Sequence, residues 1–131
     1  MSEIRSNPCS ACPYRTDVPS GVWSATEYEK LRAYDRVTFE QPFEAFACHA
    51  TPEHICSGWA VVHSTRGGEY ELLGLRILGI GAHEVPPTKI ELFASGNEAA
   101  DWGEQDIEDP SEEAMDVVAK LMSKYERLRD G

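Results

Sequence analysis

Four cysteines are the residues of this sequence whose types and spacing could do chemistry. Cys9 and Cys12 form a C-x2-C pair near the start, and Cys48 and Cys56 follow in the same half of the chain. Thiolates two residues apart can converge on one ion, and four thiolates complete a closed site. We therefore expect these four cysteines to be metal ligands, with His49 as a substitute ligand or as a hydrogen-bond partner of a ligand.

The spacing leaves the identity of the metal open. Zn²⁺ would take the four thiolates in a tetrahedral structural site, and a small domain gains folding free energy from such a site. A [4Fe-4S] cluster would use the same thiolates and could pass an electron or sense redox state. Tyr14, Phe46 and Trp59 could supply the apolar surroundings of a cluster. Zinc is our first expectation and the cluster is the alternative.

Enzymatic roles for these residues fit the sequence less well. A thioredoxin-like dithiol needs a strand before the C-x2-C pair and a helix after it, whereas Pro8 and Pro13 flank the pair here. A nucleophilic Cys48 with His63 or His83 as its base would lack an oxyanion-hole motif. We interpret His63 and His83 as ordinary core or surface residues. The sequence indicates no reaction, and a non-enzymatic role is favoured.

Length and charge restrict the other functions. A chain of 131 residues with a net charge of −11 predicts a single domain and disfavours direct nucleic-acid binding, which needs lysines and arginines. We divide the domain into a cysteine-motif half, residues 1–66, and a helical half, residues 67–131. No apolar run is long enough to span a membrane, and the start lacks the pattern of a secretory signal, so a cytoplasmic location is expected.

The acidic segment 98–116 contains nine acidic residues and no lysine or arginine. One interpretation is a solvated linker and helix start that keep the protein soluble. The other is a surface that docks a basic protein partner through electrostatic attraction. Charge alone does not separate the two.

The pattern of elements predicts a mainly α fold, with a small α+β fold as the alternative. Residues 1–22 are rich in proline, serine and glycine, so we expect a loop that the C-x2-C pair fastens to the body. Ser24 and Glu27 form a capping box that opens a helix as far as about Tyr34, and Pro110 opens the last helix after Asp109 as its cap. Further predicted elements are a short strand over 43–48 and helices over 56–63, 69–78 and 89–94.

The motifs also resemble a known pattern. Three motifs carry the resemblance: C-x2-C-P-Y-R at Cys9–Arg15, F-x-C-H ending at His49 and C-x-G at Cys56–Gly58. They are similar to the motifs of an uncharacterised family of small actinobacterial and actinophage proteins. The resemblance covers about the first half of the chain. It implies a cysteine-based metal site and a bacteriophage or actinobacterial origin, and it implies no activity. It adds Arg15 to the residues of interest.

Overall fold

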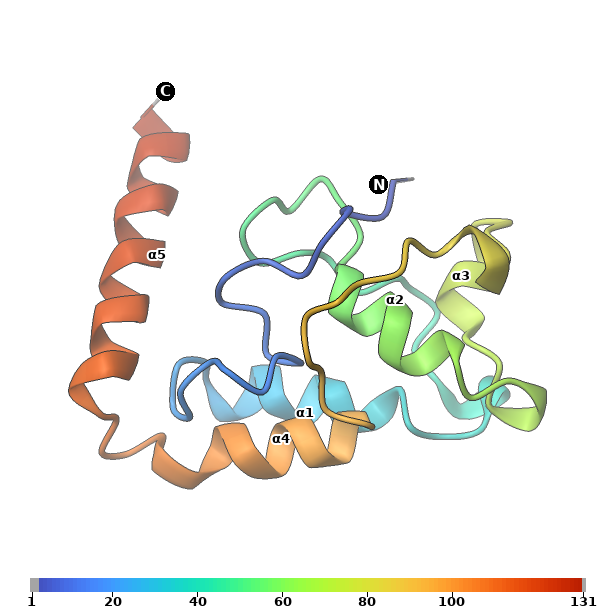
Figure 1. Cartoon of the computed structure of the whole chain (residues 1–131), viewed down its shortest axis with the longest axis horizontal. Coiled ribbons are helices and arrows are strands. Elements are labelled where there is room, and N and C mark those ends of the chain that lie inside the picture. The colour runs from blue at the N-terminus through green and yellow to red at the C-terminus, as the bar shows by residue number, and fades with distance from the viewer. Residues whose placement is uncertain (1–2, 131) are drawn as a thin grey trace.

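The computed structural model describes residues 3–130 and is mainly helical, as the sequence predicts (Figure 1). Short 3₁₀ helices at Thr38–Glu40, Gly68–Tyr70, Ala82–Glu84 and Glu104–Asp106 join the longer elements. No helix in this range is long and apolar enough to cross a membrane. The α-helices are α1 (Ala25–Ala33), α2 (Ser57–Ser64), α3 (Leu73–Ile77), α4 (Gly96–Gly103) and α5 (Glu112–Asp130).

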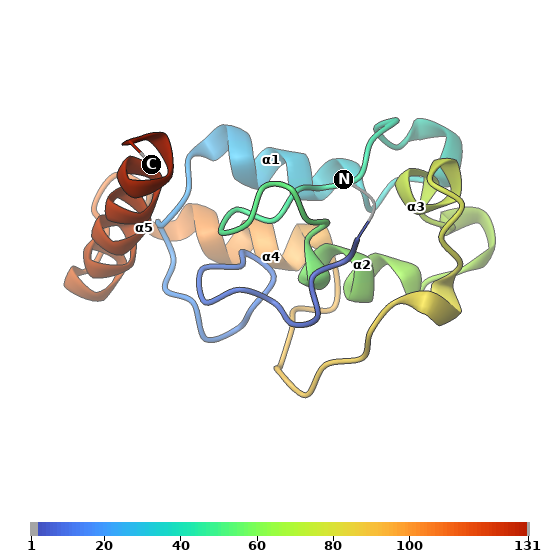
Figure 2. The same ribbon diagram turned by 90° about the horizontal axis from the view of Figure 1, so that it is seen from above.

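Helices α1 and α4 lie side by side in both ribbon views (Figures 1 and 2). α1 begins as predicted, because the Ser24 hydroxyl accepts the backbone N–H of Glu27. Leu31 is fully buried. Glycines let the two backbones approach, since a Cβ at Gly96 would overlap the carbonyl of Leu31 and one at Gly103 would overlap the Tyr28 ring.

Isolated β-bridges join the N-terminal loop to the middle of the chain. Residues 3–130 contain no longer strand. Ile55 pairs in parallel with Ile4 and antiparallel with Ala47. The Cys48 N–H donates to the His54 carbonyl over 2.9 Å, and the Cys56 N–H donates to the Phe46 carbonyl over 2.8 Å. The strand predicted over 43–48 is therefore reduced to one bridge at Ala47. The hydrogen bonds beside this bridge still fix the backbone at Cys48 and at Cys56.

The helix predicted over 89–94 is wrong. This stretch is irregular because it pairs with the cysteine loop: the Thr16 N–H donates to the Glu91 carbonyl over 3.3 Å, and the Phe93 N–H donates to the Tyr14 carbonyl over 2.9 Å. The helix predicted over 69–78 shrinks to α3, because Gly67 and Gly68 have positive φ angles and start a 3₁₀ turn instead.

The Ser95-Gly96-Asn97 sequence, which reads as a break, is the beginning of α4. The Ser95 hydroxyl accepts the Glu98 N–H over 3.1 Å, and the Glu98 carboxylate accepts the Ala94 N–H over 3.1 Å. α4 carries Trp102, whose indole N–H donates to the Val18 carbonyl over 2.9 Å. The acidic segment is thus partly a packed helix and not only a linker.

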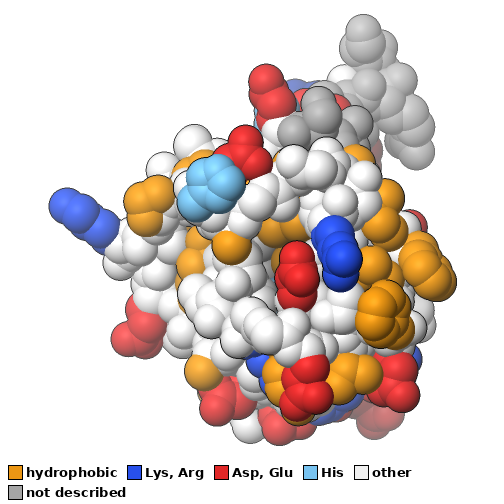
Figure 3. Space-filling model, turned by 90° about the vertical axis from the view of Figure 1, so that its right-hand side faces the viewer, with side chains coloured by type: hydrophobic (Ala, Val, Ile, Leu, Met, Phe, Trp, Pro, Cys, Tyr) orange, Lys and Arg blue, Asp and Glu red, His pale blue; other side chains and the backbone are white. Residues whose placement is uncertain are grey.

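Helix α5 stands at one end of the molecule (Figure 1). It starts at Glu112, and the cap is the Ser111 hydroxyl, which accepts the Ala114 N–H over 3.1 Å, in place of the predicted Asp109. Ala114 and Leu121 are buried, but the neighbouring Met122 is 56% exposed. Figure 3 shows the opposite end, where hydrophobic side chains gather around acidic and basic ones.

Candidate metal centre

The fold brings the four cysteines into one buried cluster. Cys9 and Cys12 come from the N-terminal loop, Cys48 follows the bridged residue Ala47, and Cys56 is the N-cap of α2. All four are at least 95% buried, and none is in a disulfide. The Sγ atoms of Cys12 and Cys56 are 3.8 Å apart although 44 residues separate them.

The thiols perturb one another's pKa values. A hydrogen bond from Cys9 lowers the pKa of Cys48 to about 4, and the same contact raises the pKa of Cys9. In the other pair, a hydrogen bond with Cys56 lowers the pKa of Cys12 and raises that of Cys56. One thiolate and one thiol per pair is what close packing of four sulfurs without a cation imposes, because adjacent negative charges repel.

Backbone amides surround the cluster. The Cys56 Sγ accepts the Trp59 N–H over 3.4 Å. Such amides stabilise negative charge on sulfur, as they do for thiolates that ligate metals. The backbone amides of Ala11, Tyr14, Ala50 and Thr51 act in the same direction, each opposing a rise in the pKa of Cys9, Cys12 or Cys48.

Glycine and arginine complete the surroundings of the sulfurs. A Cβ at Gly58 would lie 2.6 Å from the Cys12 Sγ, so the absence of a side chain makes room for the sulfur. The Arg5 guanidinium lies 4.0 Å from the Cys48 Sγ. Arg15 donates to the Cys9 carbonyl over 3.3 Å, and its positive charge helps to lower the pKa of Cys12. Arg15, which the sequence resemblance singled out, therefore fastens the cysteine loop.

Within residues 3–130, no group of three or more His, Cys, Asp or Glu side chains has the arrangement of a metal site. Among these residues the structure thus places the Cys12 and Cys56 sulfurs side by side, and it does not contain a ready-made set of four ligands. Ligation by Cys9, Cys12, Cys48 and Cys56 stays a prediction, as does the metal staple inferred from the sequence.

His49 makes its contacts away from the sulfurs. Its Nε2 lies 3.0 Å from a Glu27 carboxylate oxygen, and its ring centroid lies 4.1 Å from that of Trp23, with the two rings tilted by 40°. Its backbone carbonyl accepts the Tyr125 hydroxyl. These contacts join the segment after Cys48 to α1 and α5, so the described role of His49 is to hold that segment in place.

A buried polar chain next to the cluster has no counterpart in the sequence analysis. Tyr14 and His63 are completely buried, and the Tyr14 hydroxyl lies 2.8 Å from the His63 Nε2. Burial lowers the pKa of His63 to about 4, so the ring is neutral and its Nε2 can accept from the tyrosine. The interpretation of His63 as an ordinary core residue fits its burial but omitted this partner.

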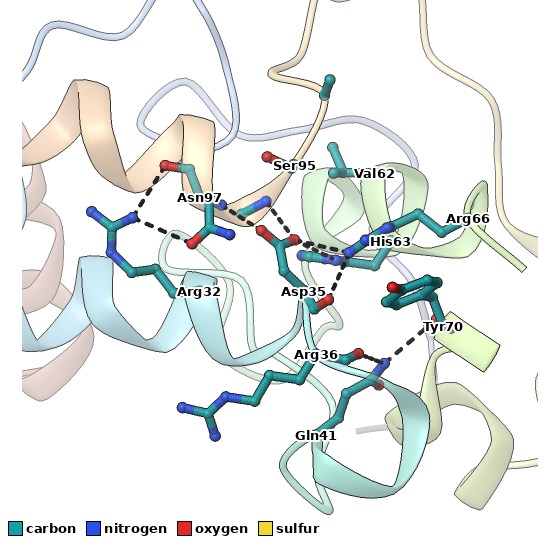
Figure 4. A network of polar contacts seen from close by, with 12 residues as sticks. Arg32, Asp35, Arg36, Gln41, Val62, His63, Arg66, Tyr70, Ser95 and Asn97 are labelled. Carbon is teal, nitrogen blue, oxygen red and sulfur yellow. Dashed lines mark hydrogen bonds and ion pairs between the residues drawn. The ribbon is translucent and has the colours of Figure 1, made fainter.

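Asp35 ends the polar chain (Figure 4). One carboxylate oxygen is 3.6 Å from the His63 Nδ1, and the carboxylate accepts the N–H groups of Gly96 and Asn97 at the start of α4. Arg66 donates to the Asp35 carbonyl over 3.0 Å. The chain ties the cysteine loop to α2 and α4, and no local spacing marks these residues because they meet only through the tertiary fold.

The acidic segment divides into two groups. Glu98 caps α4, Asp101 and Glu104 lie within 2.9 Å of Arg32, and Asp106 accepts the Ser20 hydroxyl. These residues stabilise the fold. The second group is exposed, and none of its members has an ion pair among the described residues: Glu108, Asp109, Glu112, Glu113 and Asp116.

The comparison with protein families is decisive for classification, because one family model matches residues 4–124. The chain belongs to a family of unknown function, DUF6283. The match spans the cysteine loop, the helices α1 to α4 and most of α5, so it covers more of the chain than the motifs do. No curated protein matches the chain, and no solved structure does. The cysteine cluster is the feature of this DUF6283 protein that indicates a function.

Proposed function

We propose that this DUF6283 protein is a small non-enzymatic accessory protein in which Cys9, Cys12, Cys48 and Cys56 hold one structural Zn²⁺ ion. The observation that carries the proposal is that the fold brings the Cys12 sulfur of the N-terminal loop to 3.8 Å from the Cys56 sulfur at the start of α2, where the Trp59 N–H donates to Cys56. An amide donor of this kind stabilises negative charge on a thiolate, as a tetrathiolate site requires.

The spacing of the sulfurs favours zinc over a cluster. Zinc–sulfur bonds of about 2.3 Å give a tetrahedron with edges of about 3.8 Å. The Cys12 and Cys56 sulfurs are 3.8 Å apart, so this pair would need little movement to share one ion. In a [4Fe-4S] cluster, iron and sulfide atoms lie between the cysteine sulfurs and hold them further apart. The second pair, Cys9 and Cys48, would have to turn toward the same ion.

Charge balance is compatible with a metal ion at this site. Four thiolates and one Zn²⁺ ion carry a net charge of −2, which is costly to bury without nearby cations. Arg5 beside Cys48 and Arg15 beside the Cys9–Cys12 loop supply two positive charges. Zinc would then fasten the N-terminal loop to Cys48 and to the start of α2, and its binding free energy would become folding free energy.

We further propose that the accessory role is the docking of a basic protein by the acidic surface, defined as Glu108, Asp109, Glu112, Glu113 and Asp116. The support is the division of the acidic segment: four residues stabilise the fold, while these five are exposed without internal ion pairs among residues 3–130. The resemblance of the cysteine motifs to actinophage proteins extends the proposal to a bacteriophage origin and a host-cytoplasm location.

The metal proposal is tested by purifying the protein without chelators under anaerobic, reducing conditions. Colourless protein with one zinc per chain by elemental analysis is the expected result. Brown protein with iron and acid-labile sulfide would replace zinc with the cluster and an electron-transfer or redox-sensing role. Protein with neither metal, folded and with four reactive thiols, would contradict both.

A further inference from the structure

An apolar groove lies between α5 and the turn before α1, and its volume is about 390 Å³. Val22 and Trp23 form one wall, and side chains of α5 form the other: Val118, Leu121, Met122, Tyr125 and Glu126. Hydrogen bonds hold both walls in place. The Trp23 indole N–H donates to the Ala11 carbonyl over 3.0 Å, and the Tyr125 hydroxyl donates to the carbonyl of residue 49 over 2.6 Å. A groove with fixed walls costs a ligand little free energy of ordering.

Methionines extend the apolar surface of the groove along α5. Met115 and Met122 are 59% and 56% exposed, whereas Leu121, on the side of the helix turned to the body, is buried. Together with Val118 and Tyr125 the methionines form the α5 stripe, whose members are separated by steps of three, four and three residues. This is the spacing against which a second helix packs. α5 stands at one end of the molecule in both ribbon views, which leaves space for such a helix (Figures 1 and 2).

Acidic residues border the exposed side of the α5 stripe. Glu112 lies one helical turn before the first methionine, and Glu126 lies one turn after the second. Both are exposed, and Glu126 also lines the groove. The bases of α5 lie on another side of the helix, where Lys120, Lys124 and Arg127 line a different cleft. The groove therefore offers a ligand an apolar floor with a negatively charged edge.

We propose that the groove and the α5 stripe bind a basic amphipathic helix of a protein partner; this inference rests on the acidic surface proposed above, to which Glu112 belongs. The apolar face of that helix, with anchors at positions i, i+3, i+4 and i+7, packs against Met115, Met122 and Trp23. Its lysines and arginines lie beside Glu112 and Glu126 at the edge of the groove. Methionine suits this role because its unbranched, polarizable side chain adapts to partner side chains of different shapes.

A second copy of this chain is a poorer occupant of the groove. In a symmetric dimer the same surface of both copies meets, so the edge with Glu112 and Glu126 would face its own equivalent. Like charges that meet at an interface cost free energy, whereas lysines or arginines of another protein are attracted there. The net charge of −11 adds repulsion between copies. The charge of the edge therefore selects a basic partner.

The test uses the full-length protein and a labelled synthetic peptide of about three heptads, with leucine at positions a and d, lysine at e and g, and alanine elsewhere. Fluorescence anisotropy at low salt measures the affinity. One matched peptide has glutamate in place of lysine, and another has serine in place of leucine. We expect each of them to bind at least about tenfold more weakly, because the groove needs both the charge and the apolar face. Equal binding by either would overturn the proposal.

Variants of the protein locate the binding site. Replacing both Met115 and Met122 with glutamine removes the apolar stripe but keeps long side chains that favour a helix, and it should weaken binding about tenfold. Phe39→Gln is the matched control, because Phe39 is 82% exposed but lies at the other end of the molecule (Figure 1). It should bind the peptide as wild type does. Unchanged affinity of the double variant, or an equal loss in Phe39→Gln, would overturn the proposal.

The same titrations separate this inference from the acidic surface on which it rests. If reversal of Glu112 and Glu113 weakens binding and the double methionine variant does not, the acidic surface stands and the groove is refuted. If neither change matters, both proposals fail. Sedimentation tests the second copy as occupant: a monomeric wild type supports the proposal, whereas a dimer that the methionine substitutions dissociate would overturn it.

Discussion

Replacing Gly58 with alanine is the perturbation for which the structure gives the clearest magnitude. The added Cβ would lie 2.6 Å from the Cys12 Sγ and 3.0 Å from the Tyr14 Cβ, whereas ordinary contacts start at 3.4 Å. The sulfur therefore has to move by roughly 0.8 Å, and metal–ligand distances tolerate only about 0.2 Å. We expect Gly58→Ala to weaken zinc binding by about 10- to 100-fold, the range typical of changes beside metal ligands.

The metal-free protein should respond much less to the same substitution. Overpacking costs about 1–3 kcal/mol, and alanine recovers about 1 kcal/mol of helix propensity within α2. The free energy of unfolding in chelator should thus fall by only about 0–2 kcal/mol, and the loss with zinc present should be larger. Zinc affinity is measured by competition with a calibrated chelator, and stability by urea unfolding with and without metal.

The matched control for Gly58→Ala is Ser64→Ala at the end of α2. Ser64 contacts the Val61 carbonyl through its hydroxyl and makes no contact with a cysteine in the described structure. It should keep wild-type zinc affinity. If Gly58→Ala also bound zinc as wild type does, the close packing of Gly58 against a ligand sulfur would not matter to the metal, and the reasoning would be refuted.

Three further predictions concern the buried polar chain and the acidic surface. Tyr14→Phe leaves the His63 Nε2 buried without its donor and should lower the free energy of unfolding by about 1–3 kcal/mol in chelator; an unchanged urea midpoint would contradict this. Burial lowers the folded-state pKa of His63 to about 4, below its unfolded value of about 6.5. Because the unfolded protein then binds the proton more readily, the free energy of unfolding keeps its full value above pH 6.5 and falls as the pH drops toward 4. His63→Gln should flatten that part of the pH profile of chelator-treated protein, and the same slope in both proteins would exclude His63 as its source. Charge reversal of Glu112 and Glu113 to lysine should weaken binding to a lysine-rich peptide roughly tenfold at low salt, while reversal of the exposed Glu53 should not, and equal effects would refute a localised docking surface.

Local signals in the sequence predicted the elements that depend on local contacts. Ser24, predicted as one half of a capping box, starts α1, although the Glu27 carboxylate contacts Lys30 and His49 and does not complete the box. Cys56 stands at the beginning of α2, as predicted. α5 follows from its charge distribution along the helix, with acids at its start and bases toward its end. Each of these signals lies within one or two helical turns, which is why sequence alone was sufficient.

The errors arise where distant residues decide the local structure. Ser95-Gly96-Asn97 resembles a loop, but Gly96 is needed for close approach to Leu31, and the Asp35 carboxylate caps the helix from 61 residues away. The stretch 89–94 has a helical pattern of residues, yet hydrogen bonds to Tyr14 and Thr16 keep it out of the helical conformation. Neither the cap nor the hydrogen bonds can be inferred from neighbours in the sequence.

The candidate site shows the same division. The sequence predicted that all four cysteines meet at one metal ion; the structure places Cys12 beside Cys56, and the shared site stays a prediction. Sequence reasoning did not find the pairing of Tyr14 with His63, because these residues are 49 positions apart and meet only through the tertiary fold. His49 attracted attention as the neighbour of Cys48, but its side chain contacts Glu27 and Trp23.

X-ray absorption at the zinc edge of the purified protein tests the central claim most directly, because it reports the type and number of atoms bound to the metal. The account predicts a first shell of four sulfur atoms at about 2.3 Å, supplied by Cys9, Cys12, Cys48 and Cys56. Replacing any one of them with serine should exchange one sulfur for a lighter ligand or abolish binding. A wild-type shell of nitrogen and oxygen atoms, or protein that excludes zinc while folded and reduced, would contradict it.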